Sequence, residues 1–403
     1  MIQFLKFIRF NLKPLSYGWL LTFLSSFGQT YLISLYVIHI TKAFDITEGT
    51  FGAIYAICTV ASSIIMLSIG HTVDHISVKK VSFFTILALA LCCILMGFSY
   101  HLAFVFIALV GLRLSGQGML SHISFTILSK YYDKDRGKAI SFSTLGFSIG
   151  EAILPIIIVS TIAYFDWRTA MIGSGVLLLL YLVRLKFTDL SYFDKQLDTF
   201  KPSSKSLFND FFDIIKDKRF LIVMPTSFVL SYTATAVVFF QYVFVEQKGW
   251  SVTLYASFFT AYAITRLLFS LFGGLWVDRF TAKTLFRFYL IPIGLGLLAF
   301  AYINSIAGAL IFLILMGITV GMAGTIKTSV LAEVYGLKKL GTIRSLFTMF
   351  MVLSTALGPL VVGQMIDMGM SIKIIMISLA IFVLLCVLNA QRIKNIPRVK
   401  TEI

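Results

Sequence analysis

The sequence predicts an all-α polytopic membrane protein with twelve transmembrane helices in two six-helix bundles. Three observations lead to this fold class. The chain of 403 residues is 58% hydrophobic and only 13% charged, whereas a soluble domain carries about 25% charged residues. Long segments such as Leu20–Ile40 and Val81–Tyr100 contain no Asp, Glu, Lys or Arg. One long polar stretch, residues 187–219, divides the apolar runs into two equal sets.

Each apolar run has the length of a membrane span, because about 20 residues are needed to cross the hydrocarbon layer. The resulting organisation is an N-terminal bundle of residues 1–186, a cytoplasmic linker of 187–219, a C-terminal bundle of 220–391 and a tail of 392–403. Hydropathy and the positions of charges, Pro and Gly predict twelve spans: residues 17–40, 50–69, 81–99, 103–127, 138–162, 168–186, 220–245, 252–274, 284–303, 306–331, 342–366 and 372–390.

The basic residues predict the orientation of the chain in the cytoplasmic membrane. The chain has 34 Lys and Arg residues, of which Arg113, Arg266 and Lys327 lie within spans. If both termini are cytoplasmic, nearly all of the others fall on the cytoplasmic side. The exceptions are Lys42, Arg168, Lys248 and Lys373. The positive-inside rule therefore favours cytoplasmic termini. The net charge of +16 needs no nucleic-acid partner, because basic residues that flank spans contact anionic lipid headgroups.

Two loop segments half a chain apart form an internal repeat. The first reads S-I-G-H-T-V-D-H-I-S-V-K-K (residues 68–80), and the second, after the eighth span, reads G-G-L-W-V-D-R-F-T-A-K. The second copy has no histidine, so His71 and His75 are not what the repeat requires, and a metal site or catalytic pair is disfavoured. A glycine for close helix approach, an aspartate at a helix end and neighbouring cations indicate a gating loop.

This repeat resembles the loop signature of the major facilitator superfamily, G-x-x-x-D-R-x-G-R-[KR]. The second copy keeps Gly274, Asp278, Arg279 and Lys283. The first keeps Gly70, Asp74 and Lys79 but has His75, Ser77 and Val78 at the remaining positions. The resemblance implies that the signature residues kept in the two copies form a gate between adjacent helices.

Other stretches are similar to bacterial members of the monocarboxylate-porter-like branch. They are R-G-K-A-I-S-F-S-T-L-G-F-S-I-G-E-A-I-L-P followed by D-W-R-T-A, and A-E-V-Y-G-L-K-K-L-G-T-I-R-S-L-F with A-L-G-P-L-V-V-G-Q-M-I-D-M-G. The resemblance implies two six-helix bundles around a midplane cavity that opens alternately to either side, with spans 1, 4, 7 and 10 lining it.

Two charged residues of the N-terminal half lie deep in predicted spans, where a charge is costly and usually has a partner or a function. Arg113 is central in span 4, and at helical spacing Gln117 and Ser124 share its face. The resemblance implies a role for such an arginine in proton coupling or substrate binding. Glu151 lies midway along span 5. It is either a proton-carrying carboxylate that exchanges partners or a permanent ion-pair partner of Arg113.

The C-terminal half contains two further basic residues in spans, Arg266 in span 8 and Lys327 in span 10. Tyr262 shares the face of Arg266, and this polar and aromatic stripe is suited to binding a carboxylate. The related porters place their span 8 arginine one turn nearer the loop, at the position of Ser270. Lys327 is either a cavity residue or a side chain that reaches the interface. Further cavity candidates are Gln29 and Tyr36 in span 1 and Gln241 in span 7.

These residues favour transport over catalysis. The sequence has no Cys/His metal spacing and no G-x-G-x-x-G dinucleotide fingerprint, so we expect neither an enzyme nor a cofactor. The leading hypothesis is a monomeric secondary transporter of a small organic anion, a carboxylate, coupled to protons. The alternatives are a proton-driven exporter of lipophilic drugs or a siderophore, suggested by 39 Phe and 17 Tyr, and a sensor on a transporter scaffold.

Overall fold

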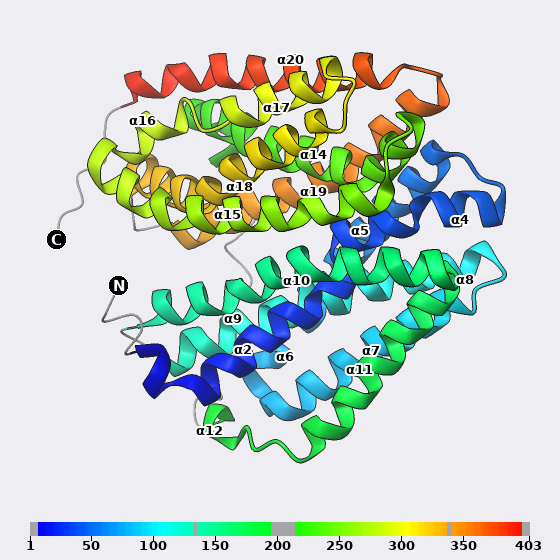
Figure 1. Cartoon of the computed structure of the whole chain (residues 1–403). Coiled ribbons are helices and arrows are strands. Elements are labelled where there is room, and N and C mark those ends of the chain that lie inside the picture. The colour runs from blue at the N-terminus through cyan, green and yellow to red at the C-terminus, as the bar shows by residue number, and fades with distance from the viewer. Residues whose placement is uncertain (1–6, 133–134, 195–213, 337–339, 397–403) are drawn as a thin grey trace. The chain divides into compact units, whose positions relative to one another are not determined.

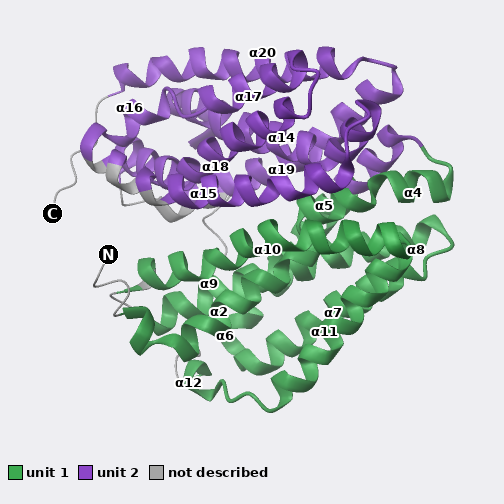
Figure 2. Ribbon diagram, in the orientation of Figure 1, with its two compact units in different colours: residues 1–46, 57–200 green, residues 47–56, 201–403 purple. Residues whose placement is uncertain are grey.

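The structure is a computed structural model that describes residues 7–132, 135–194, 214–336 and 340–396. The described residues are helical and contain no strand. Twelve helices among them are long and apolar enough to cross a membrane. Figure 1 shows how the helices follow one another along the chain. The predicted fold class is confirmed. The chain divides into two compact units, residues 1–46 with 57–200 and residues 47–56 with 201–403 (Figure 2).

Unit 1 contains span 1 and spans 3 to 6, together with most of span 2. Its first and fourth spans are each built from several consecutive helical segments. The elements are α2 (Leu12–Leu24), η1 (Ser25–Gly28), α3 (Thr30–Ile33), η2 (Ser34–Tyr36) and α4 (Val37–Phe44) in span 1, α5 (Glu48–Ile69) in span 2, α6 (Thr72–His75) in the loop, α7 (Val78–Gly97) in span 3, α8 (Leu102–Leu112), η3 (Arg113–Leu120) and α9 (Ser121–Tyr131) in span 4, α10 (Arg136–Tyr164) in span 5, α11 (Trp167–Lys186) in span 6, and the short α12 (Ser191–Asp194).

Unit 2 contains the last six spans, most of which are single long helices. The elements are α14 (Lys218–Gln247), α15 (Val252–Phe280), α16 (Ala282–Phe286) with α17 (Ile291–Tyr302), α18 (Ala307–Tyr335), α19 (Leu340–Asp367), and α20 (Ile372–Ala390) with η4 (Gln391–Asn395). They correspond to spans 7 to 12 in chain order.

Helix α5 is shared between the two units, which the sequence does not predict. Residues 47–56 group with unit 2. Within that unit, the ring of Tyr55 lies 4.2 Å from the ring of Phe239 on α14, and Phe51 stacks on the same ring at 5.7 Å. The backbone N–H of Gly49 donates to Asp367 Oδ1 at 3.0 Å. The first half of span 2 is thus anchored on spans 7 and 11.

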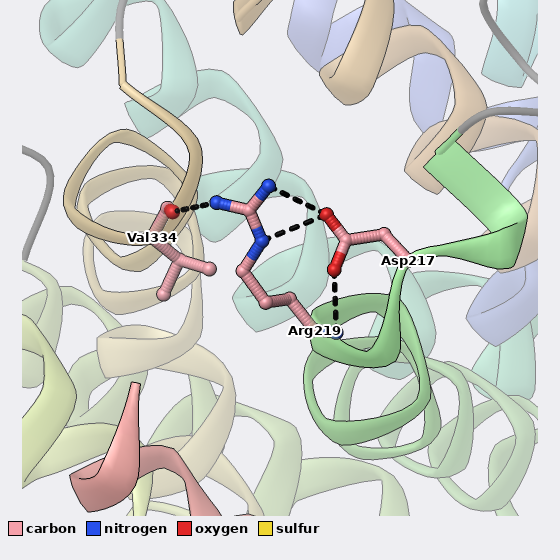
Figure 3. Close-up of polar contacts among 3 residues, drawn as sticks. All are labelled: Asp217, Arg219 and Val334. Atoms are coloured by element: carbon pink, nitrogen blue, oxygen red, sulfur yellow. Dashed lines mark hydrogen bonds and ion pairs between the residues drawn. The ribbon is translucent and has the colours of Figure 1, made fainter. Parts of the chain in front are cut away.

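A charged cluster ties the start of α14 to the end of α18 (Figure 3). Asp217 is the N-cap of α14, and its Oδ1 accepts a hydrogen bond from the backbone N–H of Arg219 at 2.8 Å. The Arg219 guanidinium binds Asp217 Oδ2 through Nε at 2.7 Å and through Nη2 at 2.6 Å. Its Nη1 donates to the Val334 carbonyl at 2.8 Å. The cluster holds the first turn of α14 against the end of α18.

Candidate functional site

Span 1 is interrupted near its middle, where the sequence predicts one continuous helix. Helix α2 ends at Leu24, and Ser25–Gly28 form a 3₁₀ turn. Gln29 then has extended backbone, with φ −80° and ψ 149°, before α3 begins at Thr30. Irregular backbone at membrane depth is tolerated only where it is buried in protein or lines a water-filled cavity. The interruption is therefore the first candidate for a functional position in unit 1.

Span 4 is irregular where it meets this interruption, because Arg113–Leu120 form a π-helix. A Cβ atom added to Gly28 would lie against the Leu112 carbonyl oxygen and 2.7 Å from the Cα atom of Gly116. The two backbones are therefore in direct contact, which only glycine permits. π-Helical turns occur frequently at functional sites, and this one contains two candidate residues, Arg113 and Gln117.

Arg113 is almost completely buried, with 4% of its surface exposed. Its Nη1 donates a hydrogen bond to the hydroxyl of Thr30 at 3.2 Å, so the guanidinium is directed at the restart of span 1. Gln117 is half-buried on the same π-helix. Thr30, which follows Gln29 directly at the interruption, carries no signal in the sequence that would mark it as a partner of Arg113.

Ser124 of span 4 packs against spans 1 and 5. Its hydroxyl donates to the Gly18 carbonyl of α2 at 2.8 Å and lies 2.6 Å from the Ser143 hydroxyl of α10. The π-helix has more residues per turn than an α-helix. It therefore changes the angular spacing of successive side chains along span 4.

Glu151 lies where span 5 crosses the interrupted span 1. The side chain is 7% exposed. A Cβ atom on the preceding residue, Gly150, would lie against the Ser26 hydroxyl and 3.0 Å from the Tyr31 hydroxyl. The interruption of span 1 thus has Arg113 bound to its Thr30 and the Glu151 turn packed at its Ser26 and Tyr31. Together these residues form the candidate site of unit 1.

The two other candidates of span 1 have different surroundings. Gln29 is half-buried at the extended residue of the interruption. Tyr36 is 2% exposed, and its hydroxyl lies beside Ser174 of α11 and near Cys93 of α7. Tyr36 therefore packs toward spans 3 and 6, whereas Gln29 belongs to the interruption.

In unit 2, the predicted residues Gln241 and Tyr262 lie along one row of aromatic rings. Gln241 is 1% exposed, and its Oε1 accepts a hydrogen bond from the Tyr255 hydroxyl at 2.9 Å. The ring of Tyr255 is 5.5 Å from that of Tyr242 and 6.1 Å from that of Phe259, which is 5.8 Å from Tyr262. The row joins α14 to the middle of α15.

The two basic candidates of unit 2 lie on α15 and α18. Arg266 is half-buried, one turn after Tyr262. A Cβ atom on Gly321 of α18 would lie 2.5 Å from the Arg266 carbonyl oxygen, so the backbones of spans 8 and 10 are in close contact there. The Lys327 ammonium lies 3.4 Å from the Met351 sulfur of α19. A thioether is a weak acceptor, and the contact directs Lys327 toward span 11.

The basic residues of the predicted gating loops bind the end of another helix in their own unit. Lys79 Nζ donates to the Lys186 carbonyl at the end of α11 at 2.7 Å, and Lys283 Nζ donates to the Ile396 carbonyl after η4 at 2.8 Å. Arg279 lies 5.3 Å from the ring of Phe280, and the Gly70 carbonyl lies 3.1 Å from His122 Nε2. The side chains of Asp74 and Asp278 and the surroundings of Gly274 lie outside the described part of the structure.

A carboxylate caps the helix that follows each loop. Asp194 Oδ1 accepts from the backbone N–H of Val78 at 2.8 Å. In unit 2, Glu333 of α18 accepts from the backbone N–H of Ala282 at 3.1 Å. Neither Asp194 nor Glu333 was identified from the sequence, because both lie far along the chain from the helix that they cap.

Comparison with known proteins agrees with this architecture. The family model described as the Major Facilitator Superfamily matches residues 18–259 and 226–401. The chain belongs to the Major Facilitator Superfamily. The superfamily assignment made from the two loop repeats is therefore confirmed, and the chain is a multi-pass membrane protein of a transporter family rather than an enzyme. No curated protein matches the sequence.

Solved structures of this superfamily share the fold at low sequence identity. A bacterial homolog of the human lysosomal transporter Spinster, in an inward-facing and occupied conformation, is 13% identical with a TM-score of 0.76 and covers 96% of this chain and 98% of its own. The nucleoside transporter NupG is 16% identical with a TM-score of 0.74, covering 94% and 99%. A POT family transporter in complex with a thioalcohol-conjugated peptide is 12% identical with a TM-score of 0.75, covering 94% and 96%.

Proposed function

We propose that this superfamily member is a secondary active transporter that moves a small organic anion, a carboxylate, by alternating access and with proton coupling. It acts as a monomer in the cytoplasmic membrane, with both termini in the cytoplasm. The observation that carries the proposal is Arg113, a guanidinium that is 4% exposed on a π-helix against an interrupted helix. The motifs of spans 5, 6, 10 and 11 favour the monocarboxylate-porter-like branch.

The placement of Arg113 supports anion binding. A charged side chain at the centre of a bilayer costs about 2.5–3.5 kcal/mol on insertion scales, so it is retained for a partner or a function. Its Nη1 binds a neutral hydroxyl, Thr30, at 3.2 Å. The guanidinium has five N–H donors in a planar fork, and a carboxylate accepts two of them in parallel.

Glu151 supports proton coupling. It is a buried carboxyl group on the span that packs against the same interruption, at Ser26 and Tyr31. Carboxylates within membrane spans commonly serve as proton relays. Protonation of Glu151 would change the charge of the site in unit 1 without any contact to the substrate.

In unit 2, Arg266 and the polar edge formed by Gln241 and Tyr262 are the second set of proposed substrate contacts. Gln241 is held by Tyr255, which fixes the orientation of its amide. Lys327, held toward span 11 by Met351, adds a further cation to the same unit. A unit with two cations in its spans is suited to an anionic substrate.

A second candidate function is a proton-driven exporter of lipophilic drugs or a siderophore. The row of rings from Tyr242 to Tyr262 favours it, because aromatic faces bind apolar and cationic ligands. In this alternative Glu151 remains the proton site, and Arg113 is an internal partner of the fold.

The test is ligand-dependent thermal stabilisation of the purified protein at two pH values. The ligand panel contains small carboxylates, siderophores, neutral solutes and lipophilic cations. We expect carboxylates to raise the melting temperature. Arg113→Lys keeps the charge but loses the fork, and should weaken carboxylate binding about tenfold or more, since each hydrogen bond to a charged group contributes about 1.5–3 kcal/mol.

The matched control is Arg392→Lys, at an exposed position of η4, which should bind carboxylates like the unchanged protein. Equal carboxylate affinity in Arg113→Lys would contradict bidentate binding by Arg113. Stabilisation by lipophilic cations or siderophores alone would favour the exporter.

A further inference from the structure

Unit 1 contains a cavity of about 570 Å³. Arg113 is not among the residues that line it. The cavity lies between the end of α5, the loop helix α6, α7 and the π-helix η3. Most of its walls are apolar, with Ile69, Phe84, Ala88 and Met119 among them. Among the lining residues that the structure describes, Lys80 is the one with a charged side chain, and the side chain of Asp74 on α6 lies outside this description. The cavity therefore has the polarity of a site for an amphiphile.

The charge and the apolar walls are arranged along one helix. Lys80 is in the first turn of α7, whereas Phe84 and Ala88 follow at one-turn intervals on the same face. At 1.5 Å per residue, the lining extends about 12 Å from Lys80 to Ala88. Lys80 lies at the predicted cytoplasmic boundary, where lipid headgroups are found, and the apolar part extends toward the membrane interior.

The second half of span 2, whose Ile69 lines the cavity, has exposed apolar side chains. Leu67 is 84% exposed and Ile64 is 60% exposed. A Cβ atom on Gly118 of span 4 would lie 3.5 Å from the Met66 sulfur of α5 and 3.6 Å from the Arg113 carbonyl oxygen, which are ordinary contacts. Phe84 on the opposite wall is 66% exposed. Apolar walls at this depth are stabilised by a hydrocarbon occupant.

We propose that this cavity binds an anionic membrane phospholipid, with one acyl chain along α7 and the phosphate at Lys80. Charge complementarity supports this occupant, because the lining residues that the structure describes include a cation and no carboxylate. The neighbouring cation, Lys79, binds the Lys186 carbonyl, and the nearby carboxylate of Asp194 binds the Val78 N–H. A small, fully polar substrate would leave the apolar walls uncovered, so the site is distinct from the proposed anion site.

The bound chain would also support the wall that carries the proposed transport residues. Ser115 and Met119 line the cavity, and they belong to the same π-helix as Arg113 and Gln117. Lipid in the cavity thus packs against one side of this π-helix while the interrupted span 1 packs against another. The lipid site does not depend on the identity of the transported substrate.

The experiment measures the thermal stability of detergent-purified, delipidated protein after addition of phosphatidylglycerol, phosphatidylcholine or phosphatidylethanolamine with identical acyl chains. Glycerol phosphate without acyl chains tests the headgroup alone. We expect phosphatidylglycerol to bind most tightly and glycerol phosphate to have no effect. Lys80→Gln should weaken phosphatidylglycerol binding about fivefold, since one basic residue near the headgroups contributes about 1 kcal/mol, and should bring it to the level of phosphatidylcholine.

Two further variants separate the cavity from general surface effects. Ala88→Phe fills the apolar part and should weaken binding of all three lipids, whereas Lys394→Gln, at an exposed position of η4, should leave the preference for phosphatidylglycerol intact. Equal binding of phosphatidylglycerol and phosphatidylcholine to the unchanged protein would overturn the proposal. An unaltered preference in Lys80→Gln would also overturn it, even if Ala88→Phe fails to fold.

Discussion

The two units share their outer framework and differ in how their central spans pack. In each unit, a loop lysine binds a carbonyl at the end of the unit's last span, Lys79 in unit 1 and Lys283 in unit 2. At the other end of the same spans, a cation lies over a tyrosine ring, Arg168 over Tyr100 at 5.2 Å and Lys373 over Tyr302 at 4.5 Å. Spans 3 and 6, and spans 9 and 12, are thus joined at both ends.

The central spans do not follow this symmetry. Span 4 is π-helical and touches span 1 through Gly28 and Gly116, whereas span 10 is one regular helix that touches span 8 through Gly321. At Gly118, span 4 meets span 2 through the flexible Met66 side chain, and the cavity lies between the end of span 2, span 3 and span 4. The difference indicates that the framework is a structural requirement of both units. The irregular centre of unit 1 is where this chain departs from its own repeat, as expected for a functional site.

The largest expected effect is at the contact between spans 1 and 4. In Gly28→Ala, the added Cβ would lie against the Leu112 carbonyl and the Gly116 Cα atom, both backbone positions. We expect destabilisation of about 3 kcal/mol, the upper part of the usual range for overpacking. Thermal unfolding and the yield of monodisperse protein measure it. Gly173→Ala on α11, where a Cβ meets nothing within 4 Å, is the control and should be as stable as the unchanged protein.

A second pair of variants compares the packing of the two units directly. Gly321→Ala places a Cβ 2.5 Å from the Arg266 carbonyl, whereas Gly118→Ala meets the flexible Met66 side chain at 3.5 Å. We expect a cost of about 1–3 kcal/mol for the first and a change within about 1 kcal/mol for the second. Equal melting temperatures for the two variants would remove the distinction between a tight and a loose central contact.

Removing the two loop lysines that bind helix ends should lower stability less, and by different amounts in the two units. Lys283→Gln removes a charged hydrogen bond donated by a side chain that is 9% exposed, and should cost about 1.5–3 kcal/mol. Lys79→Gln removes an equivalent bond in an exposed position, and should cost about 1 kcal/mol or less. The order of the two melting temperatures is the measurement. A larger loss in Lys79→Gln would contradict the account.

The smallest expected effect is on the loss of thermal stability at low pH, to which Asp217 of unit 2 contributes. Burial raises the pKa of Asp217, but the hydrogen bonds and charge of Arg219 outweigh it, so that the net pKa is lowered. The unfolded carboxyl group has a pKa of about 3.9. The stabilisation is therefore present above this pH and is lost as the pH falls through the lower folded value.

Because the Asp217–Arg219 pair is partly exposed, we expect it to contribute about 1 kcal/mol or less. Asp217→Asn should flatten the decline of the melting temperature below about pH 4. If the melting temperature of Asp217→Asn falls at low pH as steeply as that of the unchanged protein, another carboxyl group controls this fall.

Much of the fold was predictable because long apolar runs and basic flanks depend on local composition alone. The twelve spans and the superfamily followed from such features and from Gly274, Asp278, Arg279 and Lys283. The interruption at Gln29 and the π-helix at Arg113 were not predictable, because both depend on the contact of Gly28 with Gly116. For the same reason Thr30 was not identified as the partner of Arg113.

The central claim is that the irregular centre of unit 1 couples transport to protons through Glu151. The most direct measurement compares uptake driven by a proton gradient with substrate exchange at equal pH, in proteoliposomes that contain the unchanged protein or Glu151→Gln. The account predicts that Glu151→Gln loses gradient-driven uptake and retains exchange, because the amide cannot carry a proton. Undiminished gradient-driven uptake in Glu151→Gln would contradict the claim and place the coupling residue elsewhere.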